Sequence, residues 1–365
     1  MTPGHEDETA AFTTKMIDIL NKGALNLAVG IGYHSGLFEA MDTLREPATA
    51  TAIAEHAGLS ARYVREWLGI VGAGGIVEVS RGPGGKIRYR LPPAHGAVLT
   101  RRAGSANLGV YTQEIPILTE CALAPVLDGF KTGQGVPYTR YPGFQAFMGE
   151  LADAKHQRLL VDDFLPAVDG GRLLVRLHEG IGVCDLGCGQ GLAAVLMARA
   201  FPQSRFIGID ISKEAISRAR QTATEQGLTN VSFRVADAAS PDQTSELSGR
   251  MDYVTAFDAI HDQQDPQGAL AAVCRMLAEG GLFSMVDIAA HSDPIKNLDH
   301  PMAAFLYTVS LMHCMPVGLT NGGAGLGMMW GKERAEAMLR QAGFSQVDVL
   351  DIPNDSFNFH FQCRK

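Results

Sequence analysis

The sequence has 365 residues, of which 46% are hydrophobic and 19% are charged, which is enough to bury the cores of two domains. A formal net charge of −8 opposes binding to polyanions, so we expect neither nucleic acid nor a membrane surface as a partner. The six cysteines form no CxxC pair, which argues against a disulfide framework and against a zinc site, and we expect no bound metal.

No stretch of the sequence approaches the ~20 apolar residues that a membrane-spanning helix needs. The opening residues, MTPGHEDETAAFTTK, contain no basic segment that leads into an apolar one, as a secretory signal would. We therefore expect a cytoplasmic protein.

Residues 1–95 are predicted to form a mostly helical winged-helix domain. After an apolar helical stretch that starts near Asn21, the segment ATATAIAEHAGLSARYVREWLG places Ile53 on a helix, Gly58 as its stop and Ser60 at the start of a second helix. Two alternating runs around a Gly/Pro turn, GIVEVSRGPGGKIRYRL, then predict a β-hairpin. This order of elements is typical of a winged helix.

A winged helix can serve two roles. In DNA-binding proteins the second helix enters the major groove, and this hairpin carries Arg81, Lys86, Arg88 and Arg90. The acidic chain and Glu66 on the second helix work against DNA binding. The stretch ILNKGALNLAVGIGYHSGLFEAM has more hydrophobic surface than a three-helix module can hide. We therefore expect this domain to pair subunits in a homodimer and to cover a small-molecule pocket.

The rest of the chain changes in character twice. Residues 96–171 are less regular and are predicted to be a helical connector between domains. Within residues 172–365, strands alternate with helices from Gly182 onward, which predicts an α/β fold with a doubly wound, mostly parallel, Rossmann-like sheet. The last two strands are interpreted as an appended hairpin. In such sheets, ligands bind at the carboxyl ends of the strands.

The stretch VCDLGCGQG, residues 183–191, has the pattern of a strand that leads into a tight loop and a helix. Gly187, Gly189 and Gly191 have GxGxG spacing, and Asp185 precedes the first glycine by two positions. A carboxylate beside a pyrophosphate is electrostatically unfavourable, whereas beside an ammonium group it is favourable. S-adenosylmethionine carries an ammonium and a sulfonium group and no phosphate, so the loop favours it over a dinucleotide.

Two further acids follow the next two strands. Asp210 comes after Gly187 by close to the ~20 residues at which an acid accepts hydrogen bonds from ribose hydroxyls. Asp237, in VADAAS, is a candidate acceptor for the adenine amino group. Any one of these acids could merely cap a strand. Three of them on successive strands, the first beside GxGxG, favour a single nucleoside ligand.

In order and spacing, VCDLGCGQG, IGIDIS, VADAAS, FDAIHD and MLAEGGLFSMVDI resemble the motifs of class I S-adenosylmethionine-dependent methyltransferases. With the winged-helix front end and LYTVSLMHCMPVGLTNGGAGLGMMWG, nearly the whole chain resembles a bacterial methyltransferase family typified in mycobacteria, related to winged-helix small-molecule O-methyltransferases. The resemblance implies S-adenosylmethionine as methyl donor, S-adenosylhomocysteine as product, and a small-molecule acceptor.

The same resemblance implies roles for residues at the strand ends. Asp185 and the glycines would hold the methionine portion of the cofactor, and Asp210 its ribose. Asp237 with Ala238 would contact the adenine edge, and Phe257 with Asp258 would form the far wall. The full set of implied cofactor-binding residues is Asp185, Gly187, Cys188, Gly189, Gly191, Asp210, Ile211, Asp237, Ala238, Phe257 and Asp258.

FDAIHDQQDP also resembles the LHDWxD segment of winged-helix O-methyltransferases, in which the histidine is the catalytic base; here it is His261, with Gln263 in place of the tryptophan. The chemistry of methyl transfer gives an independent reason to expect a base at this position. Transfer to a hydroxyl requires removal of its proton, and imidazole, with an unperturbed pKa of ~6.5, can accept that proton near neutral pH. The alternative is that His261 only caps the following helix. His291 and His313 are weaker candidates, since the methionine spacing around His313 is typical of a core.

Two functions stay open at this point. The first is methyl transfer to a small molecule, with a hydroxyl as the expected acceptor. The second is an S-adenosylmethionine-responsive DNA-binding transcriptional regulator, which needs the same cofactor site, no base and a basic helix face. The sequence does not tell which acceptor is used, or whether oxygen, nitrogen, carbon or sulfur is methylated.

Overall fold

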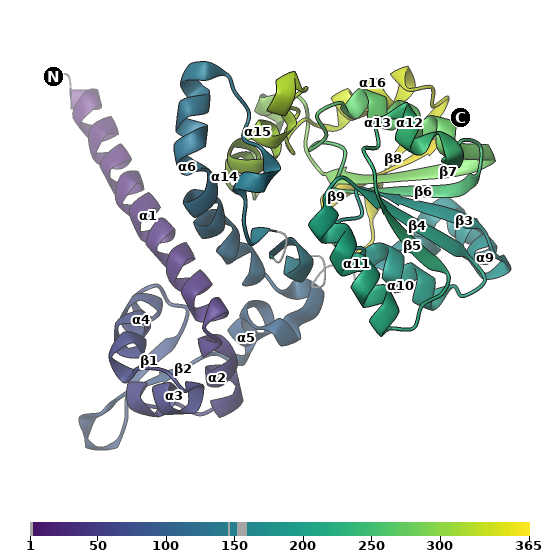
Figure 1. The fold of residues 1–365 in the computed structure, drawn as a ribbon. Coiled ribbons are helices and arrows are strands. Elements are labelled where there is room, and N and C mark those ends of the chain that lie inside the picture. Colours follow the sequence, from purple (N-terminus) through teal and green to yellow (C-terminus); the bar gives the residue numbers. More distant parts are fainter. Residues whose placement is uncertain (1–2, 145–146, 152–158) are drawn as a thin grey trace. The chain divides into compact units, whose positions relative to one another are not determined.

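The computed structural model describes residues 3–144, 147–151 and 159–365. The chain divides into two compact units, Met1–Pro116 and Ile117–Lys365, and each is described by itself (Figure 1). Among the described residues, no helix is both long and apolar enough to cross a membrane.

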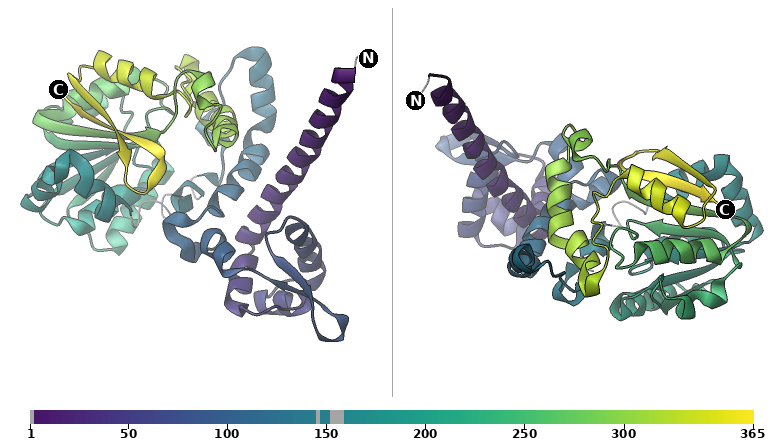
Figure 2. Two further views of the ribbon diagram at one scale, coloured as in Figure 1. Left: turned by 180° about the vertical axis from the view of Figure 1, so that it is seen from behind. Right: turned by 90° about the horizontal axis from the view of Figure 1, so that it is seen from above.

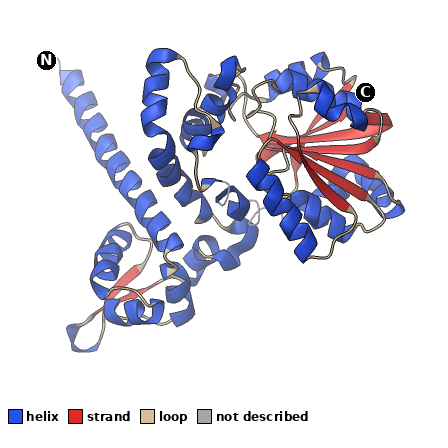
Figure 3. Cartoon of the chain, in the orientation of Figure 1, coloured by secondary structure: helices blue, strands red, loops and turns tan. Residues whose placement is uncertain are grey.

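The first unit is mostly helical and contains a small two-stranded sheet (Figure 3). Gly58 ends α3 in the left-handed conformation, with φ of 67°, as predicted. Ser60 precedes α4 as expected, but its side chain makes no capping hydrogen bond. The elements are α1 (Pro3–His34), α2 (Leu37–Leu44), α3 (Ala50–Ala57), α4 (Ala61–Ala73), β1 (Glu78–Arg81), η1 (Pro83–Gly85), β2 (Ile87–Arg90), α5 (Pro93–Leu99), η2 (Arg101–Ala106) and η3 (Val110–Gln113).

The core of this unit forms around Trp67 of α4. Its indole N–H donates to the Ala28 carbonyl at 2.8 Å, and its ring meets Phe38 edge to face at 5.3 Å. The segment after α5 also belongs here, because Asn107 donates to the Tyr33 hydroxyl at 2.9 Å. The first compact unit therefore extends to Pro116, beyond the predicted domain end at residue 95.

Helical segments lead from the boundary into the second unit. They are α6 (Glu114–Thr132), η4 (Tyr138–Arg140), η5 (Leu160–Phe164), α8 (Leu165–Ala167), η6 (Val168–Gly171) and α9 (Arg172–Glu179). η5 is a π-helical turn. η4, η5, α8 and η6 are short, whereas α6 has 19 residues.

A seven-stranded sheet follows, in the order β5-β4-β3-β6-β7-β9-β8. The first five strands in that order are parallel, and β9 pairs antiparallel with both β7 and β8. Figure 2 shows the C-terminal hairpin in yellow. The predicted doubly wound, mostly parallel sheet with an appended hairpin is confirmed. The strands are β3 (Gly182–Leu186), β4 (Arg205–Asp210), β5 (Val231–Val235), β6 (Met251–Phe257), β7 (Leu277–Ile288), β8 (Gln346–Ile352) and β9 (Asp355–Arg364).

Helices cover both faces of the sheet (Figure 1). Val183 of β3 packs among residues of α9 and α10, whereas the next residue, Cys184, packs among residues of α13 and α16. Both faces of the central strand are thus buried, as is usual for a parallel sheet that is covered by helices on both faces. The helices and turns that follow α9 are α10 (Leu192–Ala200), α11 (Lys213–Glu225), α12 (Pro241–Thr244), η7 (Ser245–Leu247), α13 (Pro266–Met276), η8 (Pro294–Asn297), α14 (Ala303–Val309), η9 (Ser310–Cys314), α15 (Met315–Gly318), η10 (Thr320–Gly322) and α16 (Lys332–Gln341).

Candidate active site

The glycine loop connects β3 to α10, and its three glycines all have positive φ. A Cβ atom on Gly191 would lie 2.5 Å from the Phe233 ring and 2.7 Å from Ala219, so only glycine fits there. A Cβ on Gly189 would meet no atom within 4 Å. Gly191 therefore serves close packing, whereas Gly189 presents its backbone to open space where a ligand can approach.

Asp210, the last residue of β4, reaches back to this loop. Its carboxylate accepts hydrogen bonds from the Gly189 N–H at 2.9 Å and the Ser212 N–H at 2.7 Å. Burial raises the pKa of Asp210, and the two N–H groups only partly offset that effect. The acid is thus held in a fixed position beside the loop.

Asp185 lies within β3 and is almost fully buried, with 3% of its surface exposed. It accepts a hydrogen bond from the Thr255 hydroxyl at 2.8 Å. Burial raises its pKa to about 7; the Thr255 hydrogen bond opposes that shift, and Asp210 adds to it. A buried carboxylate of this kind is stabilised by a cation, and loop residues 187–191 contain no Lys or Arg. Asp185 and the loop therefore fit a ligand with a positive charge better than they fit a phosphate.

The other predicted cofactor residues lie at the same edge of the sheet. Asp237 follows β5 and is exposed, and its carboxylate accepts from the Ala239 N–H at 2.9 Å. Ala238 is buried, whereas Ile211, directly after β4, is 68% exposed. Phe257 ends β6 and meets Phe164 edge to face. Since β5, β4, β3 and β6 are neighbours in that order, the structure brings the predicted residues of four strand ends into one row.

Asp258 takes a strained backbone conformation directly after β6. Its φ is +48°, which side chains other than glycine rarely adopt and which often marks functional sites. The Asn358 amide donates to its carboxylate at 2.6 Å, and its own N–H donates to the Val286 carbonyl. Asn358, on β9, was not predicted.

His261 lies four positions after β6 and is 2% exposed. Its Nδ1 is 2.8 Å from the carboxylate of Asp287, a buried residue of β7 that sequence reasoning missed. The N-cap of α13 is Asp265, whose carboxylate accepts from the Gly268 N–H at 2.8 Å. His261 therefore does not cap the helix. Its side chain contacts Asp287 instead.

Two acids act on the His261 imidazole. Burial lowers its pKa, but the nearby carboxylates of Asp287 and Asp262 outweigh burial, and the pKa is raised well above its ordinary value. The Asp262 carboxylate lies 3.5 Å from Nε2. Such a carboxylate–imidazole pair is a recurring arrangement in acid–base catalysis.

A thiol completes this group of side chains. Cys314 lies at the end of η9, and ligand atoms of His261, Asp262 and Cys314 all lie within 4.8 Å of one another. Atoms at that spacing can hold a metal ion, but acid–base chemistry at His261 needs none. The absence of a bound metal stays a prediction.

Three of the seven buried side-chain atoms without a hydrogen-bond partner among the described residues lie here. They are carboxylate oxygens of Asp262 and Asp287 and the Nε2 atom of His313. Native structures leave few such atoms unsatisfied, because each costs ~1–3 kcal/mol. Their concentration around His261 indicates a site built for a polar ligand.

The other two histidines differ in role. His313 is 3% exposed and close to this group. His291 instead places its Nδ1 2.8 Å from Glu333, at the start of α16. Burial opposes ionisation of Glu333, but hydrogen bonds from His291 and the Ser292 N–H lower its pKa to about 2. His291 therefore fixes α16 to the loop after β7.

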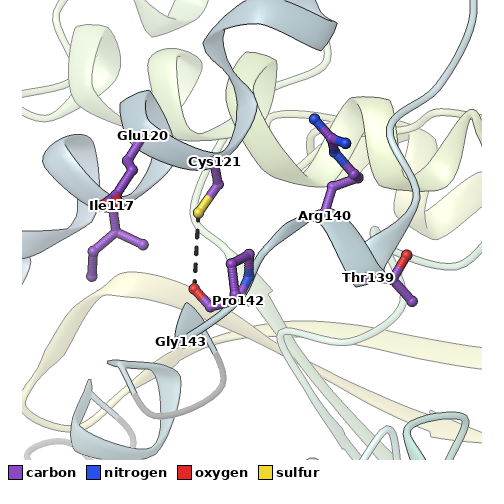
Figure 4. Close-up of a pocket in the computed structure, with 7 residues that line it drawn as sticks. All are labelled: Ile117, Glu120, Cys121, Thr139, Arg140, Pro142 and Gly143. Carbon is purple, nitrogen blue, oxygen red and sulfur yellow. Dashed lines mark hydrogen bonds between the residues drawn. The ribbon is translucent and has the colours of Figure 1, made fainter.

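A cavity of 470 Å³ in the second unit lies between α6 and the segment around η4 (Figure 4). The Cys121 thiol on one wall donates a long hydrogen bond to the Pro142 carbonyl on the other, at 3.9 Å. None of its residues was predicted. They are Ile117, Glu120, Cys121, Thr139, Arg140, Pro142 and Gly143.

The mostly parallel seven-stranded sheet with its C-terminal hairpin is the fold that the resemblance to class I S-adenosylmethionine-dependent methyltransferases implied. Residues 177–343 match the family model described as "Methyltransferase domain". Residues 23–101 match the one described as "Rv2258c-like winged HTH domain". The chain therefore carries a methyltransferase domain behind a winged helix-turn-helix domain, as the sequence predicted.

Curated relatives align with part of the chain. Aklanonic acid methyltransferase DauC of Streptomyces sp. (strain C5) is 36% identical over 141 residues, which are 38% of this chain and 60% of that protein. The ubiquinone biosynthesis O-methyltransferase of Leptothrix cholodnii is 30% identical over 103 residues, 28% of this chain and 42% of that protein. The chain thus spans 60% or less of the length of these relatives.

Solved structures of other proteins resemble this chain in fold over nearly its whole length. Human N-acetylserotonin methyltransferase in complex with SAM has a TM-score of 0.69 at 16% identity, covering 97% of each chain. The mitomycin 7-O-methyltransferase MmcR has a TM-score of 0.70 at 15% identity, covering 99% of this chain and 100% of its own. At such identities the likeness shows the fold, which these proteins share over nearly their whole length.

Proposed function

We propose that this protein transfers the methyl group of S-adenosylmethionine to a hydroxyl group of a small molecule, with His261 as general base. The observation that carries the proposal is the buried His261–Asp287 pair, which follows the strand ends of a methyltransferase domain and lies among unsatisfied polar atoms. The names of the curated relatives, an aklanonic acid methyltransferase and a ubiquinone biosynthesis O-methyltransferase, support a small-molecule acceptor. Formation of S-adenosylhomocysteine with simple phenols as acceptors tests it.

The cofactor's part is to present an electrophilic methyl group on a sulfonium. We assign the methionine portion to Asp185 and the loop. The N–H groups of Gly187 and Cys188 donate to the Ile209 carbonyl and fix the loop, and the backbone at Gly189 borders open space. Asp210, held by two N–H groups, keeps free carboxylate lone pairs for the ribose hydroxyls. The adenine would lie against a wall formed by Ile211, Asp237, Ala238, Phe257 and Asp258.

His261 removes the proton of the acceptor hydroxyl. Asp287 accepts the hydrogen bond from Nδ1–H, which leaves Nε2 to take the proton of the acceptor hydroxyl. As the acceptor oxygen forms its bond to the methyl carbon, the C–S bond breaks and the proton passes to Nε2. Asp287 then stabilises the imidazolium ion. The acids that raise the pKa of His261 make it a stronger base than free imidazole.

The DNA-binding alternative is not favoured. On α4, Arg62 forms an ion pair with Glu66, and on the hairpin Arg90 pairs with Glu78. Arg88 of the hairpin donates to the Pro47 carbonyl at 2.9 Å. Several of the basic groups that DNA phosphates would need are thus already engaged.

The loop glycines give a paired prediction. Gly191→Ala should lower the free energy of unfolding by about 2–4 kcal/mol, because its Cβ would overlap Phe233 at positive φ. Gly189→Ala should lower the free energy of unfolding by only about 1–2 kcal/mol, through backbone strain at positive φ. It should weaken S-adenosylhomocysteine binding, because the alanine methyl group would occupy space through which the ligand approaches the loop. Denaturant unfolding and calorimetry measure the two effects. Unchanged affinity of the Gly189 variant would remove this residue from the cofactor site.

We also propose that two copies pair through α1. Its exposed apolar side chains recur mostly four or seven positions apart, so many share one face of the helix. The same stripe on a second copy is its natural complement in a closed twofold dimer. The exposed set is Phe12, Met16, Ile17, Ile19, Leu20, Leu27 and Ile31.

Disruption of this stripe should produce monomers. Leu20 is 68% exposed, and Leu20→Glu would place a charge in the proposed interface, weakening the dimer at least about 30-fold. Light scattering across a concentration series measures the shift, with Lys15→Ala on the same helix as control. A parent protein that is monomeric at all concentrations, or a Leu20 variant that dimerises equally, would refute the pairing.

We place the protein in the cytoplasm. All six cysteines are free in the structure, and several are buried beside packed side chains. Reduced thiols in this number are typical of a reducing compartment.

A further inference from the structure

We propose that His313 is a positioning residue that donates a hydrogen bond to a second oxygen atom of the acceptor, close to the hydroxyl that is methylated. The inference deepens the proposed methyl transfer and rests on it for the identity of the ligand. It restricts the acceptor to flat aromatic molecules in which a hydroxyl and a hydrogen-bond-accepting oxygen are neighbours.

His313 lies in η9, a π-helical turn between α14 and α15, and such turns often occur at functional sites. Its ring packs against Phe144 at 4.1 Å between centroids and meets the edge of Tyr141 at 4.9 Å and of Tyr138 at 5.8 Å. The Tyr141 hydroxyl donates to the Met312 carbonyl at 2.8 Å, which fixes this aromatic wall to the turn. The imidazole therefore has one orientation, set by three rings.

One nitrogen of His313 is engaged and the other is not. Nδ1 lies 3.6 Å from the Cys314 sulfur. Nε2 is fully buried and has no hydrogen-bond partner within the described parts of the chain. A buried imidazole nitrogen without a partner is costly. A ligand oxygen would satisfy it.

The neighbours of the two ring nitrogens favour one tautomer. Nδ1 lies 3.6 Å from the Cys314 sulfur, and a thiol can donate to it. Burial lowers the pKa of His313; Asp262 opposes this shift, and His261 adds to it. We assign the proton of the neutral ring to Nε2, the nitrogen without a partner. His313 therefore offers a donor to an oxygen atom that can accept.

His313 and the proposed base act on one ligand because they share a neighbour. The Cys314 sulfur lies within 4.8 Å of a His261 ring nitrogen and 3.6 Å from Nδ1 of His313. Two imidazoles beside one sulfur are within reach of a single small molecule. A flat ring with adjacent oxygens would place its hydroxyl at His261 and its second oxygen at His313, against the aromatic wall.

Two probes isolate the second oxygen. 2-Methoxyphenol and 2-ethylphenol have similar shapes but differ by one ether oxygen in place of a methylene. We would measure their binding to the full-length protein saturated with S-adenosylhomocysteine, by calorimetry, and their kcat and KM with S-adenosylmethionine. The parent should bind 2-methoxyphenol about 10-fold more tightly, because 2-ethylphenol leaves the imidazole N–H unpaired.

Three variants test the assignment. His313→Phe keeps the ring packing and should abolish the preference, mainly through KM, while His313→Gln restores an N–H donor and should recover part of it. His56→Phe, at an exposed position of α3, is the control and should bind as the parent does. Equal or undetectable binding of both probes by the parent, or a preference that persists in His313→Phe, would overturn the proposal. Selective binding without turnover would uphold His313 and contradict the proposed methyl transfer.

Discussion

Replacement of His261 by Ala is expected to lower the rate of methyl transfer by about 10²–10⁴-fold while S-adenosylhomocysteine affinity stays nearly unchanged. The imidazole is 2.8 Å from Asp287 and lies outside the row of proposed cofactor residues, so its loss removes the proton acceptor and leaves the cofactor contacts in place. Single-turnover rates with a phenol, together with calorimetry, separate the two effects. The acceptor must have a proton to lose, because alignment alone can drive transfer to a free lone pair.

Asp287→Asn is the matched variant for this measurement. It keeps the size of the side chain and removes the charge that stabilises the imidazolium ion, so the rate should fall while the fold is retained. Turnover by His261→Ala equal to that of the parent would exclude His261 from the mechanism.

The pH dependence has opposite signs for activity and stability. Because Asp287 and Asp262 raise the pKa of His261, the neutral base accumulates only as the pH rises through that raised value, and the rate should rise above the ordinary imidazole range. The ionised pair stabilises the fold fully below the unfolded pKa near 6.5, and this contribution is lost as the pH rises through the folded pKa. Replacement of His261 should flatten both profiles.

Asp210→Ala should weaken S-adenosylhomocysteine binding by about 10- to 100-fold, through loss of charge-assisted hydrogen bonds worth ~1.5–3 kcal/mol. The carboxylate also accepts from the Gly189 and Ser212 N–H groups, so its removal frees the loop that would hold the methionine portion. Calorimetry with folded protein, verified by circular dichroism, measures the change.

Asp242→Ala is the control for this variant. Asp242 lies on the exposed surface of α12, outside the strand-end row, and its loss should leave affinity unchanged. Equal affinity of the Asp210 variant and the parent would mean that the ribose contact has been assigned to the wrong residue.

The local part of the candidate site could be predicted from the sequence. The strand, glycine loop and helix around Gly187–Gly191 are encoded by adjacent residues, and the parallel sheet follows from the alternation of strands and helices. Asp185 was found because it precedes Gly187 by two positions, and Asp210 because it ends the next strand. The sheet order then brings them together without further information.

The residues around His261 depend on contacts between distant parts of the chain. Asp287 belongs to β7, and its carboxylate reaches His261 only because β6 and β7 are neighbours in the sheet. Cys314 and Asn358 come from still later segments, and no spacing in the sequence links them to His261. His313 was interpreted as a core residue, and its burial agrees with that; its unsatisfied nitrogen is visible only in three dimensions.

The most direct test of the account is transfer of a labelled methyl group from S-adenosylmethionine to a panel of phenols, run in parallel with the parent, His261→Ala and Asp210→Ala. We expect labelled ether and an equal amount of S-adenosylhomocysteine from the parent. We expect little product from His261→Ala even at saturating cofactor, and product from Asp210→Ala only when the cofactor concentration is raised. Full turnover by His261→Ala, or binding of S-adenosylhomocysteine by the parent without transfer to any phenol, would contradict it.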